Sequence, residues 1–117
     1  MTDRIHELEH KIMALDSQIA LYKELLNKSR EAYVLYKQII SDQSSEYLRH
    51  LLKPDKELKR RFKEMLELLE RELKEIEKEG KSYKAKVEEL ITERRYRDKE
   101  HKAMIHKRAS HELQGGF

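Results

Sequence analysis

Leu51-Leu52-Lys53-Pro54-Asp55-Lys56 is the stretch that decides the fold, because it holds the single proline of the chain between two long helix-like segments. Proline lacks a backbone donor and pushes the preceding residue out of the helical region, so the first helix should end near Leu52 or Lys53. Asp55 can then cap a second helix. The sequence thus predicts helix one at about 3–52, a bend at 53–55, helix two at about 56–112 and a flexible tail at 113–117.

Apolar residues recur at alternating steps of three and four on both sides of the bend. Facing residues of an antiparallel pair have numbers that add to a constant, and here the constant is 109: Tyr47 faces Phe62, and Ile19 faces Leu90. Such heptads also permit a parallel coiled coil, but a central proline and arms of equal length favour folding back. The pattern therefore predicts an all-α fold, an antiparallel coiled-coil helical hairpin.

The apolar residues that face each other form a seam between the two helices, and some positions of this seam hold larger apolar side chains than others. We expect the hairpin to be held mainly near its middle, by Tyr33, Tyr36, Leu69, Leu73 and Ile76. The small residues Ser29 and Gly80 face each other, which we interpret as a local thinning of the seam; a close approach or a flexing point is the alternative. The polar run from Ser41 to Ser45 could kink helix one, but Tyr47 keeps the register beyond it, so we expect a continuous helix.

Composition limits what this chain can do. Its 117 residues are 42% charged and 38% hydrophobic, with no cysteine, which is typical of a long-helix or coiled-coil protein and leaves little globular core. No catalytic motif, phosphate-binding loop or membrane-spanning run occurs. We therefore expect a single-domain, soluble, cytoplasmic protein that is not an enzyme and takes no cofactor.

A second apolar stripe lies beside the seam, at the c and g heptad positions of both helices. A two-helix hairpin cannot cover such a stripe by itself, so we expect a partner protein, most simply a second copy that forms a homodimeric four-helix bundle. Scattered surface leucines are the alternative interpretation. We call this predicted surface the partner face: Leu21, Leu25, Leu35, Ile39, Leu58, Met65 and Leu68.

Charge is segregated along helix two. The bend is basic, and we expect a second contact there, called the bend contact: Lys59, Arg60, Arg61 and Phe62. The C-terminal part is basic as well, and its seam carries Arg94, Arg97 and His101 where leucines would be expected. The long arginine stems could cover apolar seam residues, or the cations could bind nucleic acid or another polyanion. The residues concerned form the basic C-terminal set: Arg94, Arg95, Arg97, Lys99, Lys107 and Arg108.

Side chains at the flanking heptad positions predict further neighbours. Lys11 should pair with Glu100, whereas Glu9 should lie beside Asp98. His6, Glu9 and His10 match the order of the HxxEH zinc-protease signature, but the sequence offers neither a cavity nor a third ligand. We therefore predict no metal site.

Together these features predict a non-enzymatic coiled-coil module for protein–protein interaction, serving as an adaptor, an assembly factor or a chaperone-like subunit. The alternative is a helical protein that binds nucleic acid or another polyanion through the basic C-terminal set.

Overall fold

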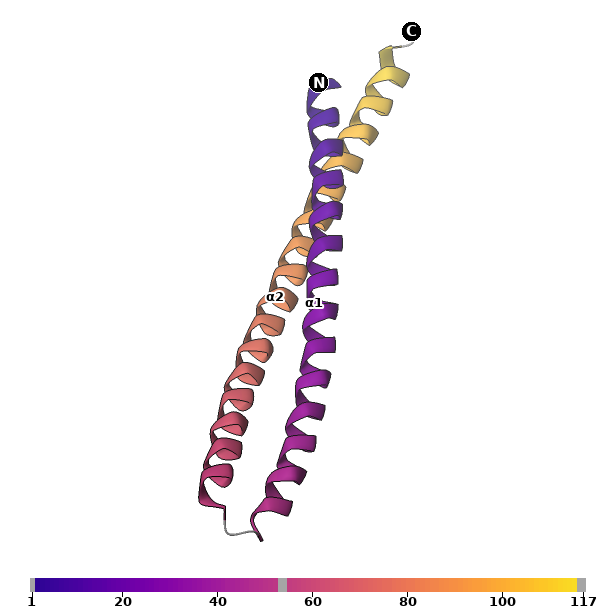
Figure 1. Ribbon diagram of the computed structural model, residues 1–117. Coiled ribbons are helices and arrows are strands. Elements are labelled where there is room, and N and C mark those ends of the chain that lie inside the picture. Colours follow the sequence, from indigo (N-terminus) through magenta and orange to yellow (C-terminus); the bar gives the residue numbers. More distant parts are fainter. Residues whose placement is uncertain (1, 53–54, 116–117) are drawn as a thin grey trace. The chain divides into compact units, whose positions relative to one another are not determined.

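The computed structural model describes residues 2–52 and 55–115, and it is a hairpin of two long helices (Figure 1). Helix α1 spans Thr2–His50 and helix α2 spans Lys56–Gly115. The predicted all-α helical hairpin is therefore confirmed. Its heptad register is confirmed too, because Ser29 contacts the helix segment at Gly80, and Ile19 shares a buried cluster with Leu90.

The bend begins earlier than the sequence predicts. Helix α1 ends at His50, and Leu51 and Leu52 form a turn. A proline disfavours helical backbone in the residue before it, and here the helix stops a few residues ahead of that position. Asp55 caps α2 as expected: its carboxylate accepts a hydrogen bond from the backbone N–H of Leu58 at 3.1 Å. Lys53 and Pro54, at the centre of the predicted bend, lie outside the described residues.

The predicted continuity of the first helix is confirmed, whereas the second helix ends later than predicted. Helix α1 runs without a break through the polar stretch 41–45, where the Ser45 hydroxyl donates to the carbonyl of Ser41 at 3.1 Å within the same helical turn. Helix α2 continues to Gly115, so residues 113–115 of the predicted flexible tail are helical. Residues 116 and 117 lie outside the described part of the chain.

The chain divides into two compact units. The terminal unit pairs residues 2–24 with 84–115, and the bend unit comprises residues 25–83. Among the described residues, the buried core lies in the terminal unit and consists of Ile5, Leu8, Leu15, Ile19, Val87 and Leu90. The best-packed part of the hairpin is therefore the part whose seam in α2 becomes most polar.

The bend unit is packed more loosely than the sequence predicts. Its seam residues, including Tyr33, Leu69 and Ile76, are only half-buried, although we expected them to hold the hairpin. Tyr36 and Leu73, which we also expected to hold the hairpin, are half-buried as well. In the terminal unit, Arg97 and His101 occupy seam positions, and their side chains are only 23% and 17% exposed.

Candidate interaction surfaces

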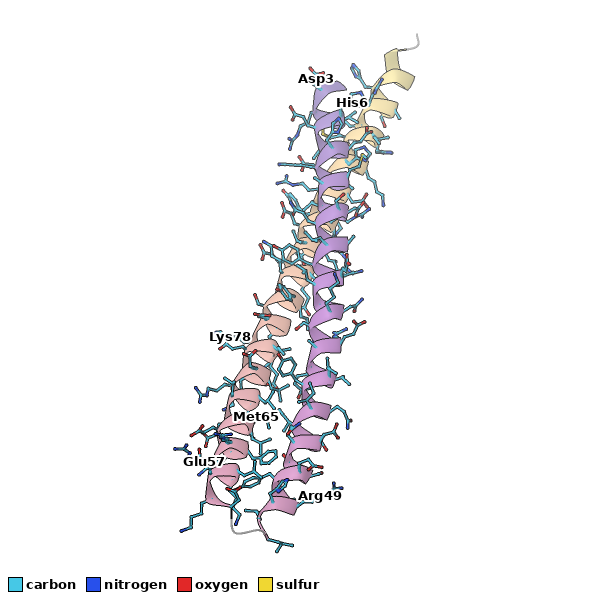
Figure 2. The ribbon with its side chains drawn as sticks, in the orientation of Figure 1. Asp3, His6, Arg49, Glu57, Met65 and Lys78 are labelled. Carbon is cyan, nitrogen blue, oxygen red and sulfur yellow. The ribbon has the colours of Figure 1, made fainter. Side chains whose placement is uncertain are left out.

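The structure gathers most of the partner face in the bend unit. Six of its seven residues belong to that unit, and Leu21 belongs to the terminal unit. Leu35 and Leu68 are 58% and 55% exposed, and Leu21 is 54% exposed. The remaining four residues, Leu25, Ile39, Leu58 and Met65, are half-buried. Figure 2 labels Met65, which belongs to α2 in the bend unit.

Two apolar grooves flank the contact between Ser29 and Gly80. A β-carbon on Gly80 would lie 3.1 Å from the Ser29 Oγ, and that hydroxyl donates to the Ile76 carbonyl at 3.2 Å. The close approach, left as an alternative by the sequence, is therefore real. One groove, of about 290 Å³, is lined by Tyr33 and Val34 among others.

The other groove, of about 220 Å³, opens on the flank of the partner face. Leu25 and Ala32 of α1 line it together with Ile76 and Tyr83 of α2. The small side chain of Ser29 also lines this groove. A groove of this size, with an apolar lining, can receive a side chain from another helix.

The bend contact is divided between the inside and the outside of the hairpin. Phe62 is half-buried and stacks on the ring of His50, with the ring centroids 5.2 Å apart. Arg60 and Arg61 point outward and both pair with Glu57, at 3.1 and 3.6 Å. Lys59 is half-buried. Figure 2 shows Glu57 on α2 and Arg49 on α1 near the bend.

The bend also exposes three leucines that the sequence reasoning did not select. Leu48, Leu51 and Leu52 are 63%, 40% and 93% exposed. None of the three occupies an a or d position of the seam, so periodicity gave no reason to choose them. The available signal was their place in the sequence, since apolar residues directly before a turn-forming proline cannot be covered by a continuing helix.

The basic C-terminal set is partly neutralised within the hairpin. Arg94 pairs with Asp16 of α1, and this carboxylate keeps the pKa of Arg94 above its ordinary value. Arg97 pairs with Glu100 at 3.1 Å and lies over the Tyr96 ring. The other four residues, Arg95, Lys99, Lys107 and Arg108, are exposed. The two arginines of the seam, Arg94 and Arg97, are therefore each paired with a carboxylate.

A cluster of ionisable groups joins the helices in the terminal unit. Glu9 accepts from two histidines: His101 Nε2 lies 3.1 Å from Glu9 Oε1, and His6 Nδ1 lies 3.4 Å from Oε2. The hydrogen bond to His101 is the main reason that the pKa of Glu9 lies below its ordinary value. Glu100 pairs with Arg4 at 2.7 Å, in place of the predicted Lys11.

Histidine and carboxylate side chains thus converge more than the sequence suggested, because His6 and His101 both reach Glu9. Even so, no group of three or more potential ligands in residues 2–52 and 55–115 has an arrangement that could hold a metal ion.

The chain matches no protein-family model, no curated protein and no solved structure. Over the described residues, neither helix has a segment apolar enough, and long enough, to cross a membrane.

Proposed function

We propose that this protein is a non-enzymatic protein–protein interaction module that binds partner helices through its partner face, most simply those of a second copy. The observation that carries this proposal is the contrast between the two units. All the buried core of the described residues lies in the terminal unit, whereas the bend unit has half-buried seam residues, exposed leucines and two apolar grooves.

Burial of the partner face supplies the driving force for association. Covering a leucine side chain completely contributes about 1.5–3 kcal/mol, and Leu35 and Leu68 still have more than half of their surface to bury. Half-buried neighbours such as Leu25 and Ile39 add to this surface. A second hairpin can supply matching helices, because paired hairpins form a four-helix bundle with a shared core. Homodimeric assembly with a two-fold axis is the most frequent form of such association.

A carboxylate introduced into the partner face tests the proposal. In sedimentation equilibrium, the wild-type protein should have twice the monomer mass of 14.2 kDa. Leu35→Glu combined with Ile39→Glu should give a monomer, because each new carboxylate would have to be desolvated in the interface. Circular dichroism should show that the helix content is largely kept, since these side chains lie beside the seam.

The matched control is Met13→Glu combined with Ile105→Glu. Both residues are exposed and apolar, both substitutions add the same charge, and neither residue belongs to the partner face. This control should remain a dimer. A wild-type monomer at high concentration would refute self-association, and loss of the dimer in the control as well would refute the assignment of the interface to the partner face.

A further inference from the structure

The bend presents an apolar tip that the hairpin itself does not cover. Leu48 lies on the last turn of α1, and Leu51 and Leu52 follow that helix. Leu52, at 93% exposed, has almost its whole side chain in contact with solvent. These three exposed leucines lie within five consecutive residues, directly before the chain reverses, and form a local apolar patch in the sequence. Exposed apolar patches of this kind mark a surface that binds something.

Lysines follow this patch along the chain. Lys56, Lys59 and Lys63 follow it on the first two turns of α2, and among the described residues none of the three forms an ion pair. The arginines nearby are different, since Arg49 pairs with Glu46 at 2.9 Å and Arg60 pairs with Glu57 at 3.1 Å. The lysines therefore leave positive charge available next to the leucines.

An apolar patch next to unpaired lysines has the chemistry that an anionic lipid surface complements. Leucines can enter the boundary between headgroups and acyl chains while lysines contact the phosphates. The two grooves in the bend unit lie near Ser29 and Gly80, some 20 residues away from the bend along each helix. The leucines of the bend therefore lie outside both grooves. A fluid lipid interface can accept such side chains without a preformed pocket.

We propose that the tip of the bend unit, residues 48–52 and 55–63, docks on an anionic lipid surface. Leu48, Leu51 and Leu52 enter the interface, and Lys56, Lys59 and Lys63 contact the phosphate groups. Of the partner face only Leu58 falls within this range, and none of the six residues assigned to the lipid contact belongs to that face, so the proposal does not depend on self-association.

Co-sedimentation with phosphatidylcholine vesicles, with and without phosphatidylserine, tests the proposal on the full chain. Binding should require phosphatidylserine and should weaken as salt is added. Replacing Lys56, Lys59 and Lys63 by glutamine should lower the partition constant on the order of a hundredfold, since each cation near an anionic surface contributes about fivefold. Leu52→Ser should lower it about tenfold.

Matched variants separate the tip from general charge and apolarity. Lys74, Lys78 and Lys81 are three exposed lysines of α2 outside the tip, and their replacement by glutamine removes the same charge. Met13→Ser removes an exposed apolar side chain that lies outside both the tip and the partner face. Both controls should bind like the wild type. The proposal is overturned by absence of binding at low salt, by equal binding to neutral vesicles, or by equal losses in the tip variants and their controls. Capture of acidic proteins, with no vesicle binding, would instead assign the tip to a protein partner.

Discussion

Gly80→Ala is the most informative single substitution in the bend unit, because two opposing effects meet at one position. In the interior of a helix, alanine is more favourable than glycine by about 1 kcal/mol. Gly80 lies well inside α2, so substitution by alanine would ordinarily stabilise the hairpin. However, the new β-carbon would lie 3.1 Å from the Ser29 Oγ, which is shorter than an ordinary van der Waals contact.

The Ser29 hydroxyl has to move to relieve this contact. It donates to the Ile76 carbonyl at 3.2 Å, so its rotation breaks a hydrogen bond that contributes about 1 kcal/mol. The two effects nearly cancel, and Gly80→Ala should change the free energy of unfolding by less than about 0.5 kcal/mol. In a Ser29→Ala background the obstacle is gone, since the Ser29 Cβ lies 4.0 Å from the modified position. In that background, Gly80→Ala should raise the free energy of unfolding by about 1 kcal/mol.

Urea unfolding followed by circular dichroism measures this double-mutant cycle. The expected coupling between the two positions is about 1 kcal/mol, which exceeds the usual error of additivity for independent sites. Equal stabilisation by Gly80→Ala in both backgrounds would show that Ser29 does not restrict position 80. A loss of stability in the Ser29→Ala background would show that the backbones themselves are too close for a β-carbon. Either result refutes the reasoning.

Three further predictions concern the helix cap, the Glu9 contact and the basic C-terminal set. Asp55→Ala should lower the free energy of unfolding by about 1 kcal/mol in urea titrations, because it removes the carboxylate that accepts from the Leu58 N–H. Asp55→Asn should keep most of this stability, because an asparagine side chain can accept the same hydrogen bond. The pKa of Glu9 lies below its ordinary value of 4.5, so its bond to His101 stabilises the fold above that pH and is lost as the pH falls through the lower folded-state pKa. Glu9→Gln should therefore flatten the acid side of a plot of stability against pH, and an unchanged slope would contradict the contact. Neutralising the basic C-terminal set should abolish any low-salt mobility shift of nucleic acid, and a wild-type protein that gives no shift would exclude polyanion binding through this set.

The hairpin and its register could be predicted because they depend on features that the sequence displays directly. A lone proline between two heptad series dictates where the chain turns, and the constant sum of facing numbers dictates which residues meet. Ser29 and Gly80 were placed opposite each other on this basis, and they are in contact. The cap at Asp55 followed from local chemistry alone.

Burial and charge pairing could not be predicted in the same way, because they depend on side-chain reach. Heptad positions pair Lys11 with Glu100, but Arg4, about two turns nearer the N-terminus, reaches to 2.7 Å from that carboxylate. Likewise, Glu9 was placed beside Asp98, whereas its carboxylate contacts His101. Heptad position gives the direction of a side chain from its helix, and rotamers decide which of several nearby groups it meets.

The two units also differ in what stabilises them, and this difference supports a division of roles. In the terminal unit, Leu8 is completely buried, and Arg4 and Glu9 of α1 form ion pairs with α2. In the bend unit, Arg60 pairs within its own helix, and Leu35 remains exposed. A ligand that binds only the folded state stabilises it by an amount that rises with the logarithm of the ligand concentration. Substitutions in the terminal unit should therefore weaken the hairpin at any protein concentration, whereas the effect of substitutions in the partner face should depend on how much partner is present.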